Sequence, residues 1–263
     1  MKRAVLVLWI FAACTAGAQW TPVVDGVDYQ RIRRGPLDAH VTRIDLRNRN
    51  IKIRASNEDD RGLTVSAFAR KRDAIVAING DYFNEQQQPI GVSIGFCGTW
   101  WKGIDVGRKE GLVAFGRGRA DIQQNTMTTR RWMKAGVTGW PLLVSNCEVI
   151  ENLPGSDHFT RAPHPRTAVG LSRDGKTVYF VVTEGRQEGV PGLTLPELAK
   201  FLREELGVCR AMNLDGGGSS AMWVRDRIVS VPSEGEERGV GNHLAVVAAS
   251  TPDDCNRNRE KKE

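Results

Sequence analysis

A run of glycines flanked by polar side chains is the part of the sequence best suited to chemistry. Asp215 is followed by Gly216, Gly217 and Gly218 and then by Ser219. Because glycine has no Cβ, several backbone N–H groups can converge there on one anion, with the Asp215 carboxylate beside it. The Gly-Lys-Ser/Thr sequence of nucleoside-triphosphate loops is absent from the run. The alternative interpretation is a tight turn between two strands.

A second polar turn, Asn79-Gly80-Asp81-Tyr82-Phe83, follows a short apolar run. An amide, a carboxylate and an aromatic ring can bind a sugar by hydrogen bonds and ring stacking. Asn79, Asp81 and Phe83 are therefore candidate substrate ligands. Taken alone, the segment is more typical of a turn capped by its aspartate.

Further candidates lie where other predicted strands begin or end. Arg166 opens one strand, Glu184 and Arg186 follow another, and Asn242-His243 opens the last. A guanidinium fork suits a phosphate, although each arginine could instead form a surface ion pair and His243 could be structural. Since ligand sites gather at strand ends, we expect these side chains to meet. Carboxylates, arginines and an anion cradle suit cleavage of a glycosidic bond to a phosphate.

The elements that position these residues indicate a mixed α/β fold, strand-rich and α+β in character. The 28 glycines favour a turn-rich chain, and Thr194 with Glu197 forms a capping box before an apolar helical stripe. We expect one domain with a mixed central sheet and a few flanking helices. The predicted elements are a hairpin over 40–53, helices over 64–72 and from 194, hairpins over 142–150 and 167–183, and strands at 74–78, 210–214, 221–224, 228–231 and 243–249.

The N-terminus has the pattern of a signal peptide over residues 1–18. Two basic residues precede the apolar run 4–13, and Ala16-Gly17-Ala18 is a small-residue cleavage site. The run is shorter than the ~20 residues that span a bilayer, so we expect an exported periplasmic or extracellular protein with no stable membrane insertion. A rival lipoprotein site lies at Cys14. The domain boundaries that we expect are a lead-in at 19–37, the main domain at 38–250 and a polar tail at 251–263.

In an exported chain the remaining cysteines favour disulfides. Cys97, Cys147, Cys209 and Cys255 allow three pairings, and we favour Cys209 with Cys255 because each flanks a predicted strand. The formal net charge is +6, with the densest basic stretch over 31–54. That stretch is either a solvated strand face or a surface attracted to anionic envelope polymers. No nucleic-acid-binding motif is present, so no nucleic-acid partner is expected.

Several motifs in order resemble the phosphodiester glycosidases related to the lysosomal uncovering enzyme. The resemblance covers about 40–249 and implies hydrolysis of N-acetylglucosamine-1-phosphodiesters or similar bonds, with a glycan or sugar-phosphodiester of the envelope, an exopolysaccharide or a teichoic-type polymer as substrate. Position 184 is usually Asp in that family, and relatives often carry Gly-Gly-Phe where this chain has Asp81-Tyr82-Phe83. The motifs are Asn79 to Phe83, Pro89-Ile90-Gly91 with Gly95, Gly139 to Leu143, Arg166 to Gly170, Glu184-Gly185-Arg186, Gly192 to Ala199, Asn213 to Ser220, Arg238 and Asn242-His243.

The mechanism that we expect pairs Asp215 with Glu184 as the two carboxylates of a glycosidase. Arg166 and the amides of Gly216–Gly218 would bind the phosphate, and Asn79 and His243 would hold sugar hydroxyls or phosphate oxygens. No cofactor is expected, although the plentiful carboxylates could hold a structural divalent cation. Two other functions stay open: a non-catalytic binder of anionic glycopolymer and a metal-dependent phosphodiesterase. The sequence leaves the oligomeric state open.

Overall fold

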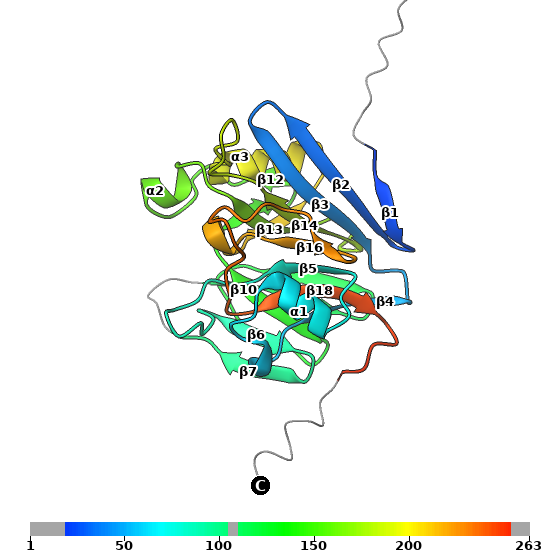
Figure 1. Cartoon of the computed structure of the whole chain (residues 1–263). Coiled ribbons are helices and arrows are strands. Elements are labelled where there is room, and N and C mark those ends of the chain that lie inside the picture. The colour runs from blue at the N-terminus through cyan, green and yellow to red at the C-terminus, as the bar shows by residue number, and fades with distance from the viewer. Residues whose placement is uncertain (1–18, 105–109, 254–263) are drawn as a thin grey trace, which may run out of the picture.

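The computed structural model describes residues 19–104 and 110–253, so the expected signal peptide, Cys14 and most of the polar tail lie outside the described residues. The described strands form three sheets, and helices are few (Figure 1). The largest sheet has the order β1 (Thr21–Val24), β2 (Val27–Arg34), β3 (Leu37–Asp45), β14 (Thr177–Thr183), β13 (Arg166–Leu171), β15 (Arg210–Asn213), β11 (Leu142–Ser145) and β12 (Glu148–Val149).

Two five-stranded sheets complete the fold. One has the order β7 (Gly98–Lys102), β6 (Val92–Gly95), β10 (Ala135–Gly139), β8 (Gly111–Gly116) and β9 (Arg119–Gln123). The other has the order β17 (Arg227–Ile228), β16 (Met222–Val224), β5 (Val76–Asn79), β18 (His243–Ala248) and β4 (Ile51–Ala55). The helices are α1 (Val65–Lys71), α2 (Asp157–Thr160), α3 (Leu195–Lys200) with a π-helical turn over Phe201–Glu205, and 3₁₀ turns over Glu58–Asp60 and Gly217–Ser219.

The expected single mixed sheet is corrected to three antiparallel sheets in a mostly β fold. Every ladder between the described strands is antiparallel. Parallel strands need long crossover connections, usually helical, and the described helices are too few and short to supply them. The largest sheet also begins before residue 38, where we expected the main domain to start, because β1 and β2 pair in sequence onto β3.

One hydrophobic core lies between the inner faces of all three sheets. Ile44, Phe180, Val246 and Phe115 come from different strands and are all essentially buried in it. Alternate residues of the same strands face outward to two helices, as the two-residue period of a strand requires. The stripe of α3 covers the outer face of the large sheet, and α1 covers the outer face of the sheet that contains β5 and β18.

Local sequence signals identified most elements but not the partner of every strand. Both predicted helix starts are confirmed, since the Thr64 hydroxyl accepts the Ala67 amide and Thr194 forms a capping box with Glu197. The hairpin predicted over 40–53 is wrong. β3 pairs with β2 and β14, whereas β4 pairs with β18 in another sheet. The turn at 48–50 carries the chain between sheets, and alternation alone does not reveal which strand is the partner.

The favoured pairing of Cys209 with Cys255 is also wrong, because Cys209 is bonded to Cys147. The two cysteines lie side by side across β11 and β15, and the Cys147 amide donates to the Cys209 carbonyl at 2.9 Å. Cys97 is disulfide-bonded as well. Among the described residues, no helix has the length and apolar character needed to cross a membrane.

Candidate active site

The ends of β5, β15 and β13 meet through backbone and amide hydrogen bonds. The Asn79 side-chain amide donates to the Asp215 carbonyl at 2.7 Å, and the Asp215 amide donates to the Gly80 carbonyl at 3.0 Å. The Gly217 amide donates to the carbonyl of Pro165 at 2.9 Å, just before β13. Two segments 136 residues apart in the sequence are therefore held together at the point predicted from strand ends.

The glycine run makes one turn of 3₁₀ helix after β15. Gly217 has a φ of +59°, a conformation that residues with a Cβ rarely adopt. The Asp215 Oδ1 accepts the Gly216 amide at 2.9 Å, which orients its half-buried carboxylate along the run. A Cβ at Gly218 would overlap the carboxyl group of Glu234, so glycine is needed for that carboxylate to approach.

Glu234 is held over the glycine run by two arginines. Its Oε1 accepts from Arg238 Nη2 at 2.5 Å and from Arg186 Nη1 at 3.5 Å. Arg238 also donates to the Ser219 hydroxyl at 3.4 Å, and Arg186 Nη2 lies 3.0 Å from where a Cβ on Gly217 would stand. About two fifths of each of these three charged side chains is exposed. The two guanidinium groups therefore hold the protein's own carboxylate over the glycine run.

Neither Glu234 nor Arg238 was among the site residues predicted from the sequence. Arg238 stood in one of the family motifs, so a signal for it existed. The sequence contains no such signal for Glu234, because its position over Gly218 depends on the path of the loop between β17 and β18. Figure 1 shows that loop descending along the side of the molecule where β18 begins.

Arg166 lies behind the glycine run and is only 3% exposed. Its Nε donates to the Leu193 carbonyl at 2.9 Å, and its Nη2 donates to the carbonyls of Phe159 and Ala162 at 2.8 and 3.0 Å. Burial lowers the Arg166 pKa to about 10, so the side chain stays charged at neutral pH. These contacts tie α2 and the start of α3 to β13, which differs from the direct phosphate contact expected from the sequence.

Glu184 is also buried, at 3% exposure, and both of its oxygens are engaged inside the protein. Oε1 accepts the Val231 backbone amide at 2.8 Å and lies 2.9 Å from His40 Nε2. Oε2 accepts from the side-chain amide of Gln187 at 3.0 Å. The His40 ring continues to the Tyr29 hydroxyl at 2.7 Å. Glu184 thus holds the start of the loop that carries Glu234, in contrast to the catalytic carboxylate that we expected.

Asp81 and Asn242 form a buried layer beneath the Asn79-Gly80 turn. The Asn242 Oδ1 accepts the Asp81 amide at 2.7 Å, and its Nδ2 donates to the Ser93 hydroxyl at 2.7 Å. Asp81 Oδ2 accepts the Gly91 amide at 2.7 Å and the Thr138 hydroxyl. Burial, reinforced by the nearby Glu110, raises the pKa of the Asp81 carboxyl well above its usual value. These two residues support the turn and are not exposed to a substrate.

His243 is placed deeper still, with no exposed surface. Its ring stacks on Phe68 at 4.4 Å, and its Nε2 lies 3.0 Å from the Leu63 carbonyl, to which it donates as the neutral Nε2–H tautomer. Burial lowers the His243 pKa to about 4. The expected contact with substrate is therefore not formed here. Phe83 is half-buried and pairs with Pro89 at the edge of the site.

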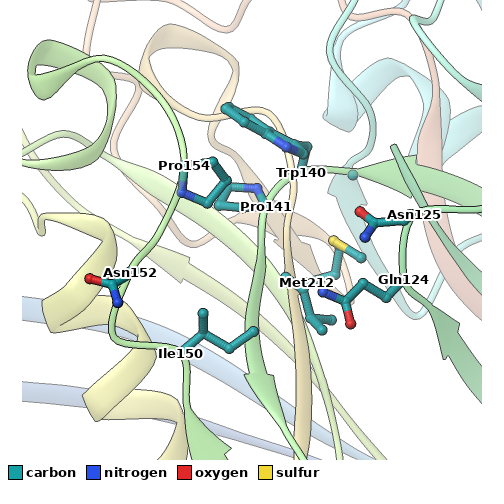
Figure 2. Close-up of a pocket in the computed structure, with 11 residues that line it drawn as sticks. Gln124, Asn125, Trp140, Pro141, Ile150, Asn152, Pro154 and Met212 are labelled. Carbon is teal, nitrogen blue, oxygen red and sulfur yellow. The ribbon is translucent and has the colours of Figure 1, made fainter. Parts of the chain in front are cut away.

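A separate cavity of about 140 Å³ opens beside Trp140 (Figure 2). Figure 2 shows Asn152 on one side of it and Gln124 and Asn125 on the other. The Trp140 ring stacks on Phe159 at 5.2 Å, so the tryptophan connects this cavity to the aromatic residues beside Arg166. The lining contains no acid, base or nucleophile, and we therefore assign the chemistry to the glycine run. Among the described residues, no cluster of three or more His, Cys, Asp or Glu side chains could hold a metal ion.

Comparison with known proteins identifies the family of this chain. The phosphodiester glycosidase family model matches residues 72–247. The bovine N-acetylglucosamine-1-phosphodiester alpha-N-acetylglucosaminidase is 29% identical over 248 residues, covering 86% of this chain and 46% of its own. The mouse enzyme of the same name is 36% identical over 88 residues, which are 34% of this chain and 16% of its own. The chain thus spans less than half the length of these curated relatives.

Solved structures show the same fold. The zebrafish N-acetylglucosamine-1-phosphodiester alpha-N-acetylglucosaminidase catalytic domain, auto-inhibited by its pro-peptide, superposes with a TM-score of 0.63 at 20% identity, covering 84% of this chain and 81% of that one. A hypothetical protein from Synechocystis superposes with a TM-score of 0.65 at 17% identity, over 89% and 64% of the two chains. Because the family model covers more than half of the sequence, the chain belongs to the phosphodiester glycosidase family.

Proposed function

We propose that this protein hydrolyses the glycosidic bond of sugar-1-phosphodiesters, of the N-acetylglucosamine-1-phosphodiester type. The observation that supports this most directly is the carboxylate of Glu234 held by Arg186 and Arg238 over the glycine run. Guanidinium groups that donate to a carboxylate there also suit a phosphate, which accepts the same hydrogen bonds. Asp215 lies at the start of that run, and we place the bond that would break beside it.

In the reaction that we propose, the substrate phosphate takes the place of the Glu234 carboxylate. The bond between the anomeric carbon and the phosphate oxygen breaks, and the electron pair leaves with a phosphomonoester. Its second pKa is about 6, so it departs with little need of a general acid. Arg186 and Arg238 stabilise the departing charge. The hydroxyl of a water molecule is added to the anomeric carbon, and the second proton of that water is released to solvent.

Asp215 is the carboxylate that we assign to this reaction, either facing the anomeric carbon or activating the water. Glu184 and Arg166 act as positioning residues, because their polar groups hold the loops that carry Glu234 and α2. The buried neutral His243 supports the same wall from behind.

We further propose that the protein is exported and acts on envelope or exopolysaccharide glycans. The disulfide between Cys147 and Cys209 favours an oxidising compartment. The sequence of residues 1–18 has the charge and apolar pattern of a signal peptide.

The test is to give the purified protein an N-acetylglucosamine-1-phosphodiester and to follow phosphorus NMR together with free-sugar release. Free N-acetylglucosamine plus a new phosphomonoester is the expected result. Sugar-1-phosphate plus a free alcohol would mean cleavage on the phosphorus side, and the proposal would fail.

The matched variants are Asp215→Asn and Asp226→Asn. In Asp215→Asn the side-chain amide oxygen can still accept the Gly216 hydrogen bond, so the fold should stay intact while turnover falls roughly a thousand-fold. Asp226 lies exposed in the turn between β16 and β17, and its substitution should be neutral. Near-normal turnover in Asp215→Asn would refute the assignment of that carboxylate.

A further inference from the structure

The end of the molecule away from the glycine run carries a second concave surface, lined largely by cations. It is a cavity of about 770 Å³. Half of its lining side chains are arginine or lysine, and none is acidic. We call this surface the basic groove. Its cations are Arg47, Arg49, Lys52, Arg54, Arg117, Lys134 and Lys176.

Only part of this charge is neutralised by nearby carboxylates. Asp253 pairs with Lys52 and Arg54 at 3.0 Å, and Asp45 pairs with Arg47 at 2.8 Å. The remaining four cations form no ion pair with a described acidic residue. Lys176 donates to the Gly118 carbonyl at 2.7 Å, while Arg49, Arg117 and Lys134 are exposed. The groove therefore keeps an excess of positive charge that a polyanion could neutralise.

The apolar residues of the groove give it a floor. Leu46 and Ile53 are buried, and Ile51 is half-buried and packs against the main core. Cations from four different segments surround that floor, namely β4 with the connection before it, the β8–β9 hairpin turn, the residue before β10 and the residue before β14. The groove is thus a concave surface assembled by the fold from distant parts of the sequence. The basic stretch noted in the sequence, over 31–54, supplies only four of the seven cations.

The basic groove is separate from the candidate active site. Lys176 precedes β14 and Glu184 follows it, and the seven residues between them span about 20 Å at the rise of a strand. Strand β18 separates the two sites in the same way, because Asn242 near the candidate active site precedes it and Ala249 of the groove follows it. Figure 1 shows the loop before β18 on one side of the molecule and β4 on the other. A small diester could not reach both sites at once.

We propose that the basic groove binds a linear anion with repeated phosphate groups, at a site independent of catalysis. Guanidinium groups match phosphate oxygens in pairs, and several separate cations favour several separate charges over one. The apolar floor suits the uncharged parts between those phosphates. If the proposed function holds, the groove would retain a polymeric substrate while its far end reaches the glycine run. The binding itself does not depend on that function.

The test measures binding of inorganic tripolyphosphate to the whole protein by calorimetry at 50 and 300 mM salt. The variant combines Arg49→Ser, Arg117→Ser and Lys134→Ser, three exposed cations without a described ion pair. We expect the wild type to bind more weakly at the higher salt and the variant to lose at least tenfold in affinity at the lower. Turnover of a small diester should be unchanged, because the substituted residues lie at the far end of the sheets.

A matched control removes the same charge elsewhere, through Lys102→Ser, Arg130→Ser and Lys200→Ser. These residues are exposed and do not line the groove. The control should bind tripolyphosphate like the wild type. The proposal is overturned if the wild type does not bind, if the groove variant binds as tightly as the wild type, or if the control loses as much. If the wild type is inactive towards every diester but still binds tripolyphosphate, the proposed function is refuted and the proposal that the basic groove binds phosphates is supported.

Discussion

If the proposed phosphate site is the one that Glu234 fills, removing the Glu234 charge should improve substrate binding. In Glu234→Gln the side chain keeps its size but no longer pairs with Arg186 and Arg238 as an anion. A substrate phosphate must otherwise displace the carboxylate from both arginines. Exposed ion pairs are worth up to about 1 kcal/mol each, so the displacement costs on the order of 1–2 kcal/mol. The variant should therefore show a KM lower by roughly 5- to 30-fold.

The assay is steady-state hydrolysis of an N-acetylglucosamine-1-phosphodiester, with inorganic phosphate as a competitive inhibitor. Because the proposed phosphate site is the one that Glu234 occupies, the inhibition constant of phosphate should fall by the same factor as KM, with kcat nearly unchanged. Glu236→Gln is the matched control, since Glu236 is exposed on the same loop and has no ion pair among the described residues. An unchanged or higher KM would refute the competition. A fall in kcat alone would mean that Glu234 acts on the substrate chemically.

Two further predictions concern buried ionisable groups and are read by urea unfolding as a function of pH. The pKa of His243 is about 4 in the folded protein and about 6.5 in the unfolded chain. Its contribution to the free energy of unfolding is therefore complete above pH 6.5 and falls by about 3 kcal/mol towards pH 4. His243→Phe should flatten that part of the profile, and an equally steep profile would contradict the assignment. The pH dependence of stability that Asp81 contributes has the opposite sign. Its raised pKa favours the protonated form in the folded protein, so stability is lost as pH rises through that pKa. Asp81→Asn should remove this loss and be at least as stable as the wild type at pH 7; a large loss at pH 7 would show that the ionised carboxylate is needed.

The local elements were predictable because their signals are short in the sequence. The Thr194 capping box and the Asp-Gly turn before Lys176 each specify a structure over a few residues, and both formed as expected. The partner of β4 and the partner of Cys209 were not predictable, since each depends on how distant segments pack. Alternating patterns in two strands are satisfied equally well by any neighbour that buries the same face.

The meeting of Asn79 and Asp215 at strand ends was predictable from the sequence, and the structure confirms it. The roles of individual residues could not be assigned in the same way. The sequence does not show which side chains are buried. A buried arginine can be engaged entirely by backbone carbonyls, whereas an exposed arginine is accessible to a phosphate. Arg166 and Arg186 both lie against the glycine run, but Arg166 is 3% exposed whereas Arg186 is 40% exposed.

The buried and exposed members of the motifs depend on one another. Glu184 holds the Val231 amide, and from there the loop carries Glu234 to Gly218 and Arg238 to Ser219. A buried carboxylate with several hydrogen bonds tolerates little movement, whereas an exposed one can be displaced by a ligand at small cost. The fold thus places a buried hydrogen-bonded layer beneath a loop whose charged tip is exposed, where the proposed function would exchange one anion for another. That division explains why so many polar motif residues are inaccessible, while the charges suited to a phosphate lie on the surface above them.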